Sequence, residues 1–171
     1  PVTFVNVGVG INLARIRHEP TAADSNWVVR VDSDGVTLRD FVIENPSTNR
    51  AFGRAVHVTG DDVTLDGNEI VAFDAQNNDA SAFGDLSAAV FIDGAARATV
   101  SNSTIPNAAI GVLARLDPTT PGPTVTDNTV TEAWQYGIRI EGGTGAVVSG
   151  NTIAHTATTT GTGQDAGISL D

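Results

Sequence analysis

The sequence predicts an all-β fold, a parallel β-helix solenoid of about six coils. Three features predict it: a phrase that returns five times, an alternation of period two inside that phrase, and no sustained helical period. The copies start 27, 35, 25 and 23 residues apart, an interval typical of solenoids whose repeats bury their apolar faces against neighbouring repeats. The copies are VTLRDFVI (Val36–Ile43), VTLDGNEI (Val63–Ile70), ATVSNSTI (Ala98–Ile105), PTVTDNTV (Pro123–Val130) and AVVSGNTI (Ala146–Ile153).

Each copy predicts two short strands separated by a kink. A central apolar residue has polar neighbours on both sides, and a second apolar residue follows five positions later, beyond a bend rich in Gly, Asn and Asp. Another short strand precedes each copy, so that bent connections supply the long return that parallel strands need. These preceding strands are expected at WVVRVD, RAVHVT, AAVFID, IGVLAR and YGIRIE, and AGISLD starts a further one.

An asparagine column recurs at the kink. Asn68, Asn128 and Asn151 occupy the same position of the repeat, where the third copy has Ser103 and the first has Phe41. Asparagine tolerates left-handed bends and can bond its own backbone, and stacked amides can form a ladder along a solenoid. We therefore expect these side chains to have a structural role, either as separate turns or as a ladder.

The strings VTLDGNEI, VTDNTV and VVSGNTI resemble the repeats of right-handed parallel β-helix, pectate-lyase-like proteins, and are most similar to the carbohydrate-binding and sugar-hydrolase repeat group. The resemblance covers most of the chain, from Trp27 to Asp171. It implies the fold and extracellular carbohydrate as a partner. It does not select one activity, because this fold hosts lyases, hydrolases, epimerases, tail spikes and fibres.

The chain is expected to form one domain. Residues 1–26 are interpreted as an irregular N-terminal segment or a first coil, and residues 27–171 as the β-helix. Because a fresh strand, AGISLD, closes the sequence, we interpret the chain as a piece of a longer solenoid. The strand edges of that last rung also predict end-to-end self-association or a fibre.

The net charge of the chain argues against several classes of binding partner. Twenty acidic residues oppose nine basic ones, all Arg, which gives a net charge of −11. This charge disfavours nucleic acids and anionic membranes, and no apolar run is long enough to span a bilayer. An acidic surface without Lys is typical of proteins from high-salt organisms. Cysteine is absent and does not settle the compartment; the fold and the acidity favour an extracellular or cell-surface location.

The strands before each copy place two outward columns side by side. Residues expected to point inward are Val29, Val31, Val56, Val58, Val90, Ile92, Val112, Ala114, Ile138, Ile140, Ile168 and Leu170. One outward column should run through Arg30, His57, Phe91, Leu113, Arg139 and Ser169, and the next through Asp32, Thr59, Asp93, Arg115, Glu141 and Asp171.

Two interpretations of these columns stay open. Asp93, Glu141 and Arg115 are the candidate catalytic residues. The two carboxylates lie two rungs or roughly 9–10 Å apart, at or just past the upper limit for the pair of an inverting glycosidase, and Arg115 between them is a candidate base of a lyase. The same three residues can instead form a surface salt ladder, which is the interpretation we favour. In either case Arg115, Arg139, Glu141, Asp93, Phe91 and His57 are the candidate ligand-binding residues, because charged groups bind hydroxyls and uronates and an aromatic face packs against a sugar ring.

No column contains a complete acid/base set. This favours a non-catalytic glycan-binding or scaffolding module, a surface or viral fibre component, over a polysaccharide lyase or glycoside hydrolase. The three histidines are isolated in sequence, so no metal site or cofactor is expected. Ca²⁺ is the one possible exception, if Asp61, Asp62 and Asp85 meet at a turn as oxygen ligands.

Overall fold

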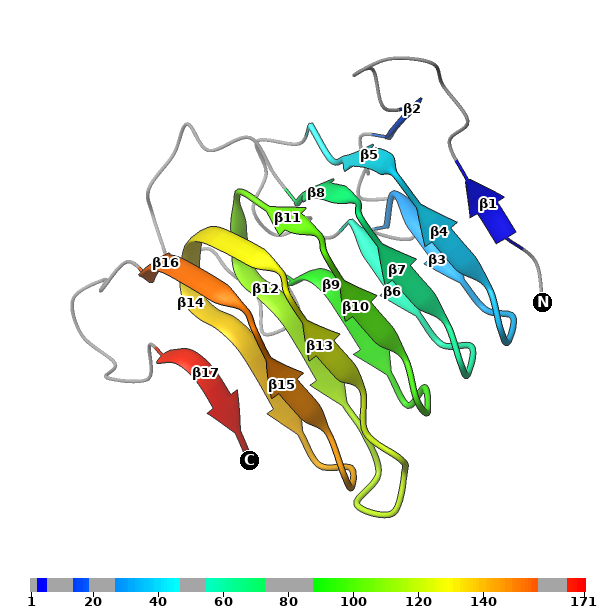
Figure 1. The fold of residues 1–171 in the computed structure, drawn as a ribbon, viewed down its shortest axis with the longest axis vertical. Helices are drawn as coiled ribbons and strands as arrows, with labels where there is room; N and C mark the ends of the chain where they lie inside the picture. The colour runs from blue at the N-terminus through cyan, green and yellow to red at the C-terminus, as the bar shows by residue number, and fades with distance from the viewer. Residues whose placement is uncertain (1–2, 6–13, 19–26, 47–54, 73–87, 157–165) are drawn as a thin grey trace.

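The computed structural model describes residues 3–5, 14–18, 27–46, 55–72, 88–156 and 166–171. Within these residues the regular structure consists of strands β1 to β17, and no helix occurs among them. The strands stack side by side along one axis, from β1 at the N-terminal end to β17 at the C-terminal end (Figure 1). The all-β class predicted from the sequence is confirmed.

The strands line three faces, which we name after their members in the first complete coil. The β3 face contains β3 (Val29–Val31), β6 (Val56–Val58), β9 (Ala88–Asp93), β12 (Ala108–Arg115), the second half of β14 (Thr129–Glu141) and β17 (Ala166–Leu170). The β4 face contains β1 (Thr3–Val5), β4 (Thr37–Arg39), β7 (Thr64–Asp66), β10 (Thr99–Ser101), β13 (Thr124–Thr126) and β15 (Val147–Ser149). The β5 face contains β2 (Ala14–Arg17), β5 (Phe41–Glu44), β8 (Glu69–Val71), β11 (Thr104–Ile105), the first half of β14 and β16 (Thr152–Thr156).

All of these strand pairs are parallel and hold the register that the repeats predict. On the β4 face, for example, Leu38, Leu65 and Val100 lie opposite one another on successive strands. The number of complete coils is smaller than the six expected. Among the described residues the first coil has strands only on the β4 and β5 faces, and the last has only β17.

The interior is one continuous column of aliphatic side chains. Nine of the twelve residues expected to point inward are at most 5% exposed on the complete coils, from Val31 to Ile140. Val29, at the N-terminal end, is only partly buried. At the opposite end, Ile168 and Leu170 are 46% and 65% exposed, so the expectation that they are buried is wrong: each continues an inward column, but no described strand lies beyond β17 to cover it.

The corner between the β4 and β5 faces has a left-handed backbone residue in each of the five coils where the structure describes it. This column consists of Asp40, Gly67, Asn102, Asp127 and Gly150, with φ angles between 50° and 66°. Gly, Asn and Asp are the residues that adopt this conformation at least cost. The kink predicted from the sequence is therefore real, and its left-handed residue directly precedes the asparagine column in all five copies.

The asparagine column forms a ladder inside the corner. Asn128 Oδ1 accepts a hydrogen bond from the backbone N of Ser103 at 2.9 Å, and its Nδ2 donates to Val100 O at 2.9 Å. Asn151 Oδ1 accepts from the Asn128 backbone in the same way, at 3.0 Å. Each side chain thus bonds the preceding coil, and of the two roles left open by the sequence the ladder is the correct one.

A second corner explains why β12 and β14 are long. Gly111, Gly137 and Gly167 lie on successive strands where the chain passes toward the β3 face. A Cβ atom on Gly137 would lie 2.6 Å from Ile153 Cγ2 and 2.7 Å from Gly167 O. Glycine therefore lets the backbone of one coil approach the next closely enough for these strands to turn without breaking.

Candidate functional site

The two outward columns of the β3 face have the register that the sequence predicts. Arg30 lies opposite His57, His57 opposite Phe91, and Leu113 opposite both Phe91 and Arg139. In the neighbouring column Arg115 lies opposite Asp93 on one side and Glu141 on the other. Asp32, Thr59 and Asp171 directly follow β3, β6 and β17, so six successive strands or strand ends present one polar or charged side chain each, about 4.8 Å apart.

The first column is largely covered rather than open. Phe91 is 4% exposed and Leu113 fully buried, in an apolar cluster outside the solenoid core that also contains Ala88, Ile110 and Tyr136. The expectation that Phe91 offers an open ring to a ligand is therefore wrong. Its ring instead stacks on His57, with centroids 5.3 Å apart and planes inclined by 6°.

Trp27 completes an aromatic stack and was missed by the sequence analysis. Its ring lies 4.2 Å from the His57 ring and 5.8 Å from the Phe91 ring, near-parallel to both. Trp27 is only partly buried, so it is the accessible aromatic group of this cluster. It precedes β3 and stands outside the alternating pattern, and a column argument based on strand positions therefore could not assign it.

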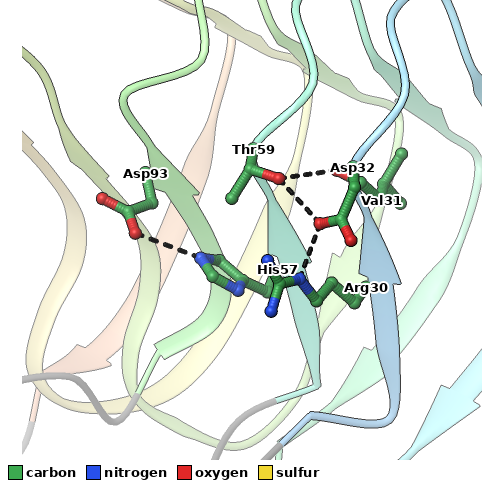
Figure 2. Close-up of polar contacts among 6 residues, drawn as sticks. All are labelled: Arg30, Val31, Asp32, His57, Thr59 and Asp93. Atoms are coloured by element: carbon green, nitrogen blue, oxygen red, sulfur yellow. Dashed lines mark hydrogen bonds and ion pairs between the residues drawn. The ribbon is translucent and has the colours of Figure 1, made fainter. Parts of the chain in front are cut away.

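His57 and Asp93 form a contact across two neighbouring strands. His57 Nε2 lies 3.3 Å from Asp93 Oδ2, as Figure 2 shows. Because a carboxylate accepts, this contact selects the tautomer with the proton on Nε2. Nδ1 is buried and has no hydrogen-bond partner among the described residues. Burial lowers the pKa of His57, and the hydrogen bond to Asp93 opposes this only in part.

Asp32 is the second carboxylate of this region, and it was not among the predicted site residues. Arg30 Nε donates to Asp32 Oδ1 at 2.6 Å, and Thr59 Oγ1 donates to the same oxygen at 2.7 Å (Figure 2). These two hydrogen bonds, that from Arg30 first, lower the pKa of Asp32. Its side chain is 55% exposed, so a carboxylate held ionised is open to solvent beside the His57–Asp93 pair.

We name the second outward column, from Asp32 to Asp171, the polar strip. Its C-terminal half takes part in an ion-pair network. Arg115 Nε lies 2.5 Å from Glu141 Oε2, and Arg139 Nε lies 3.0 Å from Glu141 Oε1. Arg139 also reaches Asp171 on the next strand at 3.2 Å, and its guanidinium sits over the Tyr136 ring, 4.8 Å from the centroid. The proposed ladder thus forms only in part, because within the described residues Asp93 pairs with His57 and not with Arg115.

The aspartates considered for Ca²⁺ belong to a turn. Asp62 accepts two hydrogen bonds from Arg97, at 2.7 and 2.8 Å, and Asp61 Oδ1 accepts from the Ala96 backbone at 2.8 Å. Asp85 lies outside the described residues. Within the part of the chain that the structure describes, no group of three or more His, Asp or Glu side chains is placed to hold a metal ion.

These observations define the class of protein as a parallel β-helix with a polar strip on one face. The chain belongs to the family described as right handed beta helix region, whose model matches residues 24–170. Neither the curated proteins nor the solved structures give a match. Among the described residues, no helix has the length and hydropathy needed to cross a bilayer.

Proposed function

We propose that this chain is an extracellular or cell-surface module that binds a polysaccharide along the second outward column of the β3 face. The observation that carries the proposal is the placement of one hydrogen-bonding side chain on, or directly after, each of six successive strands. These are Asp32, Thr59, Asp93, Arg115, Glu141 and Asp171. A polysaccharide repeats its hydroxyl groups along its length, so it can form similar hydrogen bonds with the side chains of successive strands.

The chemistry of the strip suits sugar hydroxyls. Carboxylates accept from hydroxyl groups and guanidinium groups donate to them, and both form stronger hydrogen bonds than neutral groups do. The strip is open enough for this contact: the side chains of Asp32 and Asp93 are 55% and 50% exposed. Trp27 adds an aromatic ring at the N-terminal end, where it can pack against the apolar face of a sugar.

The charge of the protein further restricts the class of polysaccharide that it can bind. The net charge of −11 repels polyanions in general. Arg115 is the positive group of the second outward column, Arg30 and Arg139 lie beside it, and each of the three already pairs with Asp32 or Glu141. This favours neutral or weakly acidic polysaccharides over heavily charged ones.

Binding is tested by calorimetric titration with a panel of neutral and uronate-containing oligosaccharides. Asp93→Asn and Glu141→Gln should each weaken binding by about tenfold or more, since hydrogen bonds to charged groups contribute about 1.5–3 kcal/mol. Thr119→Ala, in the exposed turn that follows β12 and outside both outward columns, is the control and should bind like the parent chain. Equal affinities for all four proteins, or no binding to any glycan, would contradict the proposal.

A second candidate function rests on Asp32, Asp93 and His57. A carboxylate held ionised and a carboxylate bonded to histidine occupy the same column two rungs apart, roughly 9–10 Å, at the upper limit for a pair that hydrolyses glycosidic bonds with inversion. Asp32 would accept a proton from the attacking water. The His57–Asp93 pair, once it has bound a second proton, would give that proton to the leaving oxygen; because the pKa of His57 is lowered, this form is favoured at acidic pH. Release of reducing ends that Asp32→Asn and Asp93→Asn both abolish would establish this function; binding without release would exclude it for the glycans tested.

A further inference from the structure

The corner between β10 and β11 carries a sequence motif that the polar strip does not use. Asn102, Ser103 and Thr104 form the pattern Asn-X-Ser/Thr, in which X is any residue except proline. This pattern marks an asparagine whose side-chain amide can accept an oligosaccharide. No other asparagine of the sequence fits it, because residues 45–47 read Asn-Pro-Ser and have proline at the middle position.

The structure places the two defining residues of this motif at the surface. Asn102 has a left-handed backbone, with a φ angle of 50°, and is exposed in the corner between the β4 and β5 faces. Thr104, which supplies the hydroxyl group of the motif, is exposed at the start of β11. Ser103 between them is buried, and its backbone N donates to Asn128 Oδ1 in the asparagine ladder. The buried residue therefore anchors the segment, and its two neighbours remain accessible.

The neighbouring corner residues do not cover the Asn102 side chain. In the preceding coil this position is Gly67, which has no side chain. In the following coil it is Asp127, whose carboxylate turns toward the coil beyond, since a Cβ atom on Gly150 would overlap Asp127 Oδ1. A bulky group attached to Asn102 would therefore extend from the corner into solvent.

The amide nitrogen of Asn102 can be substituted without loss of its hydrogen bond. Among the described residues, Asn102 Nδ2 donates one hydrogen bond, to Asp66 Oδ1 at 2.7 Å. A side-chain amide carries two hydrogens on its nitrogen. One of them can be replaced by a sugar while the other keeps the contact with Asp66.

We propose that Asn102 is a site of N-glycosylation. This inference rests on the extracellular or cell-surface location that we propose for the chain, because this modification is made on chains that leave the cytoplasm. The sugar donor is a lipid-linked oligosaccharide. A bond forms between Asn102 Nδ2 and the anomeric carbon, and the bond between that carbon and a phosphate oxygen of the lipid breaks. The lipid phosphate leaves with the electron pair, and Nδ2 loses one proton.

The oligosaccharide is attached before this part of the chain folds. The backbone N of Asn102 donates to Thr126 O in the following coil at 3.2 Å, and that of Thr104 donates to Asn68 O in the preceding coil at 2.8 Å. While these bonds hold, an enzyme cannot draw the segment into its active site. After folding, the oligosaccharide lies at a corner that is not part of the β3 face, so the polar strip stays open to its own ligand.

Peptide mass mapping of the chain purified from the organism that produces it tests the modification. In a chain recovered from the medium or the cell surface, the peptide that contains Asn102 should be heavier than its sequence by one oligosaccharide. Enzymatic release should convert this asparagine to aspartate. Asn45, which the proline excludes from the motif, is the internal control and should stay unmodified. An unmodified Asn102 in a chain found outside the cell would overturn the inference and leave the location intact, whereas a chain found only inside the cell would contradict both.

Variants of the full chain, secreted from a host that attaches N-linked oligosaccharides, test the motif itself. Thr104→Ala should lose the added mass, and Thr104→Ser should keep it, because serine also satisfies the pattern. Pro118→Asn, in the exposed turn after β12, creates a second motif and should carry a second oligosaccharide. A chain modified at this new position but not at Asn102 would overturn the proposal. Affinity for polysaccharide does not enter these readouts, so a failure of the proposed binding function is detected separately, by calorimetric titration.

Discussion

Buried asparagines bond one coil to the preceding coil. Asn128 satisfies two backbone groups of that coil, the N–H of Ser103 and the carbonyl of Val100, and is 1% exposed. Removing its amide leaves both groups buried without a partner. An unpaired buried polar group costs more than the net gain from the hydrogen bond it has lost. The ladder therefore resists substitution more than its polar character suggests.

We expect Asn128→Ala to lower the free energy of unfolding by about 2–6 kcal/mol, from two unpaired groups at about 1–3 kcal/mol each. Asn151→Ala, in the less buried last position of the ladder, should cost clearly less. Urea denaturation of the three proteins gives the comparison. Equal losses of unfolding free energy at both positions would show that the contribution of an asparagine to stability does not depend on its burial.

His57 makes stability depend on pH. Its pKa is lowered in the folded state, chiefly by burial, so the unfolded chain binds this proton more readily than the folded chain does. The contribution is therefore present above the unfolded pKa of about 6.5 and is lost as the pH falls toward the folded pKa. Arg30, Asp32 and Asp93 are the charged groups that shift this titration among the described residues.

The melting temperature should fall between pH 7.5 and pH 5.5, and His57→Gln should flatten this part of the profile. Asp66, whose pKa is lowered first by the hydrogen bond from Asn102, acts in a separate window: its contribution is lost below about pH 4. Calorimetric scans of both proteins over pH 3–8 resolve the two windows. A slope above pH 5 that persists in His57→Gln would assign it to another group.

At the scale of the element, the strands and their register could be predicted from the sequence. The side chains that pack on the outer side of the strands could not. Period two and the repeat fix which side chains point inward, and Val56, Ile92 and Ile138 are all fully buried as expected. The outward residue Leu113 is equally buried, because an additional apolar cluster covers this part of the β3 face. Alternation tells which side of a strand a residue occupies, but not what packs on that side.

The same limit explains the candidate site. Column geometry correctly placed Asp93, Arg115 and Glu141 on successive strands. It did not determine how the side chains would pair, since each charged group has neighbours both along its column and across it. Arg139 therefore shares Glu141 with Arg115, and Asp93 turns to His57. Trp27 lies outside the two outward columns, so its place in the aromatic stack could be found only from the folded chain.

The corner that contains Gly111, Gly137 and Gly167 gives a prediction about how closely neighbouring strands pack. Gly137→Ala should destabilise the chain by about 1–3 kcal/mol, because its Cβ would lie within 2.7 Å of Ile153 and of the Gly167 carbonyl. Gly167→Ala lies in the same column on the last strand, where a Cβ meets no atom within 4 Å. It should leave stability within about 0.5 kcal/mol of the parent. Thermal unfolding of the two variants measures the difference, and equal losses would contradict the close packing of this corner.

At the scale of the whole molecule, the dominant feature is uncompensated negative charge. The net charge of −11 is distributed over strands that lie only about 4.8 Å apart, and folding brings these charges closer than they are in the unfolded chain. Salt shortens the range of the repulsion, to about 3 Å at 1 M. We propose on this ground that the chain is adapted to high salt.

The melting temperature should rise steadily from dilute buffer to molar sodium chloride. Potassium chloride at the same ionic strength should act alike if screening is the cause. A melting temperature that stays flat or falls over this range would rule out adaptation to high salt and leave an ordinary acidic protein. The measurement is made on dilute protein, so that association does not contribute to the shift.

The parallel register, in which each coil bonds only to the coils beside it, also determines how the molecule responds to force. A pull applied at the two ends cannot load the interior without first peeling a terminal coil, because no described strand pair skips a neighbour. Extension should therefore proceed coil by coil. The repeat intervals of 23 to 35 residues set the lengths released, about 80–120 Å per step for a fully extended chain. The molecule would lengthen under load in unequal increments, whose order along the chain is given by the spacing of its own repeats.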